Sequence, residues 1–134
     1  MKYLLDVNVL VAWGWMEHTD HERVAKWLAR GRSQSDTEFL TSPIPELGFV
    51  RVSVQRAAGT VAVKEACITL EGMLASLGQT HSFIPDDQRG SGSPVWCKVA
   101  ARTTDAYLLA LANAYDAKLV TLDRGIPDAL VVPV

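Results

Sequence analysis

Four acidic residues lie far apart along the chain but are of a type and placement that could share one site: Asp6, Glu46, Asp105 and Asp123. Asp6 is the most informative, because it interrupts the apolar segment MKYLLDVNVLVAW. A buried, ionised carboxylate is costly unless it is paired, hydrogen-bonded or bound to a metal ion. Hard divalent cations take carboxylate oxygens as ligands, and they can activate a water and stabilise a phosphodiester as it breaks. These residues therefore indicate metal-dependent hydrolysis of phosphodiesters.

An α/β fold could bring these acids together, and the hydrophobic pattern predicts such a fold. Short apolar strands are expected at 2–7, 38–41, within 81–87, 117–123 and 130–134. Helices are expected at 8–15, 21–32, 43–56, 61–77 and 103–115. Ser42 is the expected N-cap of one helix, a threonine is expected to cap the helix that contains Asp105, and Pro133 suggests an edge position for the last strand. This alternation favours a short central, mainly parallel sheet covered by helices, in one domain that spans 1–134.

The same fold would place the four acids at one edge of the sheet. Asp6 and Asp123 lie at the carboxyl ends of expected strands, and Glu46 and Asp105 lie in the first turns of expected helices. In parallel α/β sheets these ends meet on one side, where ligands bind. Each acid alone also has a structural explanation, as a favourable charge at a helix start or as a turn residue. We favour a shared site because four unrelated explanations would have to coincide at that edge.

Polar and basic neighbours would complete such a site. Asn8 either shares the strand face of Asp6 or lies just past the strand, so its side chain is expected to point into the same cleft. The net charge of −2 gives no basic footprint for nucleic acid. If the four candidate ligands are set aside, however, the other 11 of the 15 acidic residues face 13 Lys and Arg residues. Lys98 and Arg102, between the glycine-rich loop at 89–94 and Asp105, are the basic residues expected to contact phosphate.

Several other classes of protein are disfavoured. Cys67 and Cys97 stand alone in the sequence, so two thiols are expected rather than a disulfide or a zinc site. No apolar run approaches the roughly 18 to 20 residues that a membrane-spanning helix needs, and the N-terminus does not have the pattern of a signal peptide. We therefore expect a cytoplasmic protein without a membrane partner.

Four segments taken together resemble a known family. LLDVNVLVA, PIPELGFVRVS, TTDAYLLALANAY and LVTLDRG are similar, in this order and over nearly the whole chain, to the PIN-domain ribonucleases and above all to the VapC-type toxins. The resemblance implies a PIN-like three-layer α/β/α fold and RNA cleavage that depends on Mg²⁺ or Mn²⁺. It also implies a homodimer, a role as the toxin of a toxin–antitoxin pair, and a cognate antitoxin whose C-terminal segment lies over the active cleft.

The resemblance also assigns roles to individual residues. It makes Asp6, Glu46, Asp105 and Asp123 the metal-binding and catalytic acids, and it places Asn8 and Thr104 at the family's neighbouring polar positions. The segment VWCKVAART lacks the Gly-His-Arg stretch expected before the third acid, which affects substrate contacts rather than metal binding. Arg-Gly follows Asp123, so a five-acid site is not supported.

Two alternative functions keep the same fold. One is a PIN nuclease of RNA processing or DNA repair that is not a toxin. The other is a catalytically silent binding module, against which the complete set of four acids argues.

Overall fold

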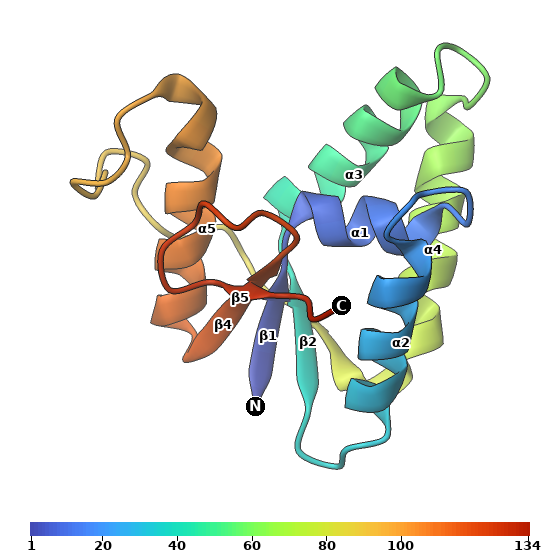
Figure 1. Cartoon of the computed structure of the whole chain (residues 1–134), viewed down its shortest axis with the longest axis horizontal. Helices are drawn as coiled ribbons and strands as arrows, with labels where there is room; N and C mark the ends of the chain where they lie inside the picture. Colours follow the sequence, from blue (N-terminus) through green and yellow to red (C-terminus); the bar gives the residue numbers. More distant parts are fainter.

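The computed structural model describes residues 1–134 and shows one sheet between two layers of helices (Figure 1). The strand order is β3-β2-β1-β4-β5, and every neighbouring pair of strands is parallel. The strands are β1 Lys2–Leu5, β2 Glu38–Thr41, β3 His81–Phe83, β4 Ala117–Thr121 and β5 Leu130–Val131. The expected α/β fold with a short parallel sheet is therefore confirmed.

Helices cover both faces of the sheet. They are α1 Val7–Gly14, α2 His21–Arg32, α3 Pro43–Arg56, α4 Val63–Leu77 and α5 Thr103–Ala114, with short 3₁₀ turns at Gly78–Thr80 and Ala100–Arg102. Successive strand residues point to opposite faces, and in β1 Leu5 packs into the core beneath α1, α2, α3 and α4, whereas Leu4 packs beneath α5. In Figure 1, α5 accordingly lies apart from α2 and α4, on the other side of the strands. These layers are the α/β/α arrangement that the resemblance implies.

Several element ends differ from the expectation. The first strand ends at Leu5 rather than at residue 7, because Asp6 caps α1 and ends the extended segment. β4 ends at Thr121, two residues before Asp123, and the last strand contains only Leu130–Val131. That strand lies at the edge of the sheet, as Pro133 suggests.

The helix caps differ in part from the expectation, whereas the cysteines agree with it. Ser42 occupies the N-cap position of α3 but makes no capping hydrogen bond with its side chain. The threonine cap expected for α5 is wrong, because the N-cap is Arg102 and the Thr103 hydroxyl instead donates to the carbonyl of Ala100. Cys67 and Cys97 are both free, as expected.

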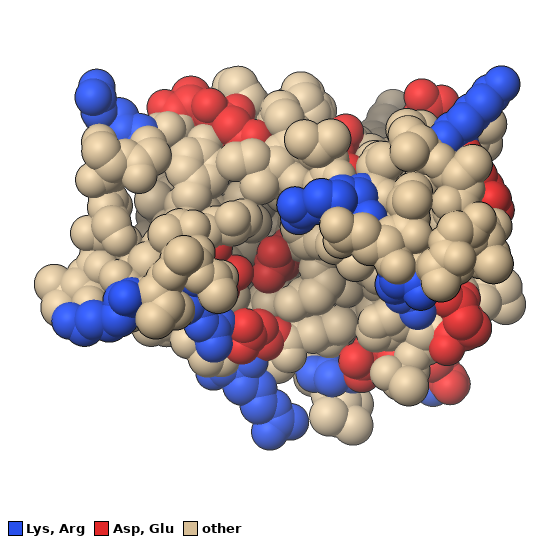
Figure 2. Space-filling model, turned by 90° about the horizontal axis from the view of Figure 1, so that it is seen from above, with Lys and Arg blue, Asp and Glu red and all other residues tan.

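The parallel order of the strands determines which edge of the sheet carries the candidate site. The carboxyl ends of β1, β2 and β4 lie at one edge of the sheet, where α1 and α3 begin directly after their strands. The N-terminal end of α5 also lies at this edge, which is at the top of Figure 1 and faces the viewer in Figure 2. No helix of the chain is long and apolar enough to cross a membrane.

Candidate active site

Asp6 is buried at the junction between β1 and α1, with only 5% of its surface exposed. One carboxylate oxygen accepts a hydrogen bond from the backbone N–H of Val7 at 2.7 Å, and the other accepts one from the hydroxyl of Thr121 at 2.8 Å. Burial nevertheless raises the pKa of Asp6, and the nearby carboxylates of Asp105 and Asp123 raise it further. The hydrogen bonds thus compensate the buried charge only in part.

Thr121 is the residue that joins α1 to the end of β4, and the sequence analysis did not single it out. It is fully buried, and its oxygen accepts hydrogen bonds from the side-chain amide of Asn8 and from the backbone N–H of Asp123, each at 3.1 Å. The Asn8 carbonyl in turn accepts from the backbone N–H of Leu122 at 3.0 Å. Asn8 lies in α1, past the end of the strand, and its side chain holds Thr121 and the backbone of Leu122 in place through these hydrogen bonds.

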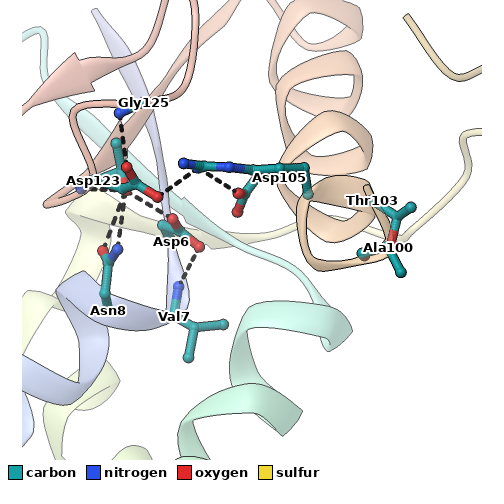
Figure 3. A network of polar contacts seen from close by, with 10 residues as sticks. Asp6, Val7, Asn8, Ala100, Thr103, Asp105, Asp123 and Gly125 are labelled. Atoms are coloured by element: carbon teal, nitrogen blue, oxygen red, sulfur yellow. Dashed lines mark hydrogen bonds and ion pairs between the residues drawn. The ribbon is translucent and has the colours of Figure 1, made fainter. Parts of the chain in front are cut away.

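Arg102 joins Asp105 and Asp123 across the mouth of the site. One nitrogen of its guanidinium donates to Asp123 at 2.6 Å and to Asp105 at 3.1 Å (Figure 3). The backbone N–H of Gly125 donates to the second oxygen of Asp123 at 2.7 Å. This N–H lowers the pKa of Asp123, and Arg102 lowers it further. The hydrogen bonds to the two carboxylates raise the pKa of Arg102.

Gly125 makes the position of the Arg102 guanidinium possible. A Cβ atom at residue 125 would lie 2.5 Å from the outer nitrogen of Arg102, which is closer than such atoms approach. Arg102, expected to contact phosphate, therefore has its charge already shared by two carboxylates. Lys98, the other expected phosphate contact, is exposed and does not line the cleft described below.

Glu46 lies in the first turn of α3, as expected, but its side chain makes different contacts from those of the other acids. Its carboxylate accepts a hydrogen bond of 2.7 Å from the hydroxyl of Thr41, which also lies 2.7 Å from a ring nitrogen of His81. Burial lowers the pKa of His81, and the Glu46 carboxylate offsets part of this shift. Glu46 lines a separate groove together with Leu47 and Phe83. The structure therefore brings Asp6, Asp105 and Asp123 together and holds Glu46 on Thr41.

A cleft of about 430 Å³ opens beside these acids. Asp6, Asn8, Thr104 and Asp105 line one part of it, so four of the expected site residues face the same space. The remaining lining residues come from α1, the segment after it, and α3: Val7, Val11, His18, Arg51, Val52 and Arg56. Figure 2 shows acidic side chains inside a central hollow and basic side chains around it.

Comparison with known proteins identifies the family. No family model matches the chain. Ribonuclease VapC39 of Mycobacterium tuberculosis is 34% identical over 133 residues, which cover 96% of this chain and 94% of the relative. Ribonuclease VapC29 of the same organism is 35% identical over 127 residues, which cover 94% of this chain and 89% of the relative. The chain belongs to the VapC family.

The expected membership of the VapC-type PIN proteins is thus confirmed over nearly the full length of this VapC chain. A third relative, ribonuclease VapC44 of Mycobacterium tuberculosis, is 36% identical over 135 residues, with 94% of this chain and 89% of the relative covered. The match to ribonuclease VapC39 leaves only a few residues of this chain uncovered.

The donor set of this VapC protein fits a hard divalent cation. Asp6, Asp105 and Asp123 supply only carboxylate oxygens, which are the ligands that Mg²⁺ and Mn²⁺ prefer. A cation beside Asp6 would also favour the ionised carboxylate, whose pKa burial raises. No group of three or more Asp, Glu, His or Cys side chains is already arranged as a metal site. Arg102 forms ion pairs with two of these acids, Asp105 and Asp123.

Proposed function

We propose that this VapC protein is a metal-dependent endoribonuclease that hydrolyses RNA phosphodiester bonds and acts as the toxin of a toxin–antitoxin pair. The observation that carries the proposal is the grouping of Asp6, Asp105 and Asp123 at one end of the sheet, with Asp6 and Asp105 lining an open cleft. The relatives are named ribonucleases, and the same edge of the sheet is where ligands bind in parallel α/β folds.

Asp6, Asp105 and Asp123 would hold the Mg²⁺ or Mn²⁺ ion, and Glu46 would join them after leaving Thr41. When bound, such an ion supplies charge that activates a water and stabilises the breaking phosphodiester. Thr121 fixes the Asp6 carboxylate, and Asn8 fixes Thr121, so both act as positioning residues. Thr104 lines the cleft next to Asp105, where its hydroxyl can orient the scissile phosphate.

The proposal is tested with purified Asp6→Asn and Asp105→Asn variants. In the presence of Mn²⁺ we expect each to cleave RNA at least about 100-fold more slowly than the unmodified protein, because each lacks a ligand charge. Asp128→Asn is the matched control, since Asp128 lies in a separate pocket beside Met1 and Lys118 and adopts a backbone conformation that asparagine tolerates. Full cleavage by Asp6→Asn at equal metal concentration would contradict the assignment.

The toxin role is tested in cells. We expect expression of the unmodified protein to arrest growth, and co-expression of its antitoxin, encoded as a neighbouring small protein, to relieve the arrest. The Asp6→Asn variant is expected not to arrest growth. Growth arrest that no antitoxin relieves, together with RNA cleavage, would instead favour the PIN nuclease that is not a toxin. Failure of the unmodified protein to bind Mn²⁺ in calorimetry would favour the silent binding module.

An antitoxin or a second copy of the chain would need an apolar surface to bind, and Leu47 of α3 and Phe83 of β3 offer one where they line a groove beside α4. Each exposes more than half of its surface, as do Val63 and Ile68 of α4. Exposed apolar patches of this kind are typical of protein–protein interaction sites. The homodimer and the antitoxin complex are therefore part of the proposed function, and these side chains are candidates for burial in either one.

A further inference from the structure

The cleft has a second wall, formed by α3, whose residues none of the expected roles includes. Arg51, Val52 and Arg56 lie on α3 and line the same space as Asp6 and Asp105. His18, between α1 and α2, completes this wall. Acids and arginines thus face one cleft from different elements: the β1–α1 junction, α1 and α5 supply one part, and α3 supplies the other.

Arg51 is the cation of this wall that has no partner. It is exposed and forms no ion pair with any acidic residue. Arg56 is held by Glu17 through one guanidinium nitrogen at 2.7 Å, which leaves its other N–H groups free to donate. His18 accepts a hydrogen bond on Nδ1 from the backbone N–H of Asp20, which leaves Nε2 as the ring nitrogen that can donate. The wall therefore presents hydrogen-bond donors and one unneutralised positive charge.

A polyanion that approaches the three carboxylates needs such a wall. Carboxylates and phosphates repel each other, and one bound divalent cation offsets only part of the charge of three acids and a nucleic acid backbone. Arg102 is already shared by Asp105 and Asp123, and Lys98 lies outside the cleft. Of the basic residues at this edge of the sheet, Arg51 is the one whose charge is both unpaired and directed at the cleft.

We propose that Arg51, assisted by Arg56 and His18, binds a backbone phosphate next to the scissile bond and so holds the RNA strand against α3. This inference rests on the proposed ribonuclease function and assigns the substrate-positioning side of the same cleft. The apolar side chains of Val11 and Val52 line the same cleft and give the sugar or base a surface to contact. Arginine suits the task because its N–H groups match two phosphate oxygens at once.

The size of the cleft indicates the form of the RNA. Its volume of about 430 Å³ lies at the lower end of the range for pockets that hold one small molecule, about 300–1,000 Å³. One nucleotide of an extended strand fits such a space, whereas a duplex can only lie across its mouth. A single extended strand is therefore the probe that can reach the acids and the α3 wall at the same time.

The test separates binding from cleavage. Binding of a fluorescent single-stranded RNA oligonucleotide is measured by anisotropy at several KCl concentrations, in the Asp6→Asn background so that the RNA stays intact. We expect Arg51→Gln to weaken binding about tenfold at low salt and to reduce the slope of log K against log [salt] by about 0.7, the contribution of one phosphate contact to a single strand. Arg51→Lys keeps the charge and is expected to retain most of the slope.

The matched control is Arg30→Gln. Arg30 is also exposed and unpaired, but it lies in the last turn of α2 near Tyr3 and Gln34, outside the cleft. We expect this variant to bind RNA with the affinity and salt slope of its parent. With the catalytic Asp6 restored, Arg51→Gln is expected to raise KM more than it lowers kcat, which a general loss of folded protein does not do.

Two results would overturn the inference, and they have different meanings. If Arg51→Gln binds RNA with the same affinity and salt slope as Arg30→Gln, the RNA does not contact the α3 wall, although the ribonuclease assignment stands. If the unmodified protein neither cleaves RNA with Mn²⁺ nor binds it, the proposed function fails and the inference fails with it.

Discussion

The carboxylate of Asp6 receives hydrogen bonds of 2.7 Å from Val7 and 2.8 Å from Thr121, yet burial still raises its pKa. Without a bound cation, the ionised side chain therefore makes the folded protein less stable than it would be with a neutral group in its place. Groups that a protein keeps at a cost to stability are often those that its function requires. The sequence already indicated this conflict, because an acid interrupts an otherwise apolar segment.

The cost of Asp6 is measurable as a dependence of stability on pH. Its pKa is about 3.8 in the unfolded chain and higher in the folded protein, so between these values the folded protein holds the proton more tightly. The free energy of unfolding contributed by Asp6 therefore falls as the pH rises through this window. Asp6→Asn lacks this proton, so we expect its stability relative to the unmodified protein to increase with pH and then to level off. Urea unfolding with EDTA, from about pH 4 to about pH 8, tests this.

A difference in stability that stays constant over this pH range would contradict the prediction. Asp128→Asn serves again as the control, and its stability is expected to follow that of the unmodified protein. Since both substitutions remove one carboxylate, any change in overall charge affects the two variants alike.

The sequence indicated part of the grouping at the site. Of the six residues expected there, Asp6, Asn8, Thr104 and Asp105 line one cleft, whereas Glu46 lines another groove and Asp123 is held by Arg102. Thr121 was missed because its role depends on strand register: Leu5 of β1 pairs with Val120 of β4, which sets the Thr121 hydroxyl beside the Asp6 carboxylate. A hydroxyl at the end of an apolar strand, two residues before Asp123, was the available signal.

At the scale of elements, the position of α3 relative to α1 depends on one close approach. Gly48 of α3 is buried against Val7 at the start of α1, and a Cβ atom at residue 48 would lie 2.5 Å from a methyl carbon of Val7. Valine in a helix has little rotational freedom, so it cannot move aside easily. Val7 also supplies the N–H that binds Asp6, and therefore this contact links the basic wall on α3 to the acids.

Gly48→Ala is predicted to cost about 1–3 kcal/mol through overpacking. Alanine gains about 1 kcal/mol over glycine in a helix interior, so we expect a net loss of stability of up to about 2 kcal/mol. Gly72→Ala in α4 is the matched control, because nothing lies within 4 Å of its Cβ position, and it is expected to stabilise the protein by about 0.5–1 kcal/mol. Urea unfolding measures both changes. A gain in stability for Gly48→Ala would show that α1 and α3 can separate without cost.

The type and order of the elements could be predicted from the sequence, whereas several of their ends could not. The helix at His21–Arg32 and the strand at Glu38–Thr41 have the expected bounds, since hydrophobic period and turn residues agree there. The predicted first strand was longer than β1, because LLDV is mostly apolar and could continue the strand. In the structure, the capping hydrogen bond of Asp6 ends the strand earlier. Propensity alone does not show which of these two effects is stronger.

At the scale of the whole molecule, the net charge of −2 does not reveal that acidic residues and arginines line different parts of one cleft. The expected basic contacts, Lys98 and Arg102, were chosen for their position next to Asp105 in the sequence. The structure instead brings Arg51 and Arg56 opposite the acids, because α3 starts from the neighbouring strand β2 and rises at the same edge of the sheet (Figures 1 and 2). Such a long-range placement depends on the packing of α3 on α1, which no local sequence pattern specifies.

Metal binding should also stabilise the whole fold, because the ligand residues belong to segments far apart in the chain. Asp6 follows β1, Asp105 is in α5 and Asp123 follows β4, so the unfolded chain presents no such site. At a Mn²⁺ concentration about 100 times the Kd, linkage stabilises the folded protein by about 2.7 kcal/mol. For a chain of 134 residues, this corresponds to a rise in Tm of roughly 10 °C.

Differential scanning calorimetry with and without Mn²⁺ measures this rise in Tm. We expect Asp128→Asn to show the full rise and Asp105→Asn to show little of it, because only the second substitution removes a ligand. EDTA should return the unmodified protein to its lower Tm without unfolding it at room temperature, because the buried apolar residues on both faces of the sheet do not depend on the ion. An equal rise in Asp105→Asn would mean that Mn²⁺ binds elsewhere on the protein, and the three acids would then lose their proposed role as its ligands.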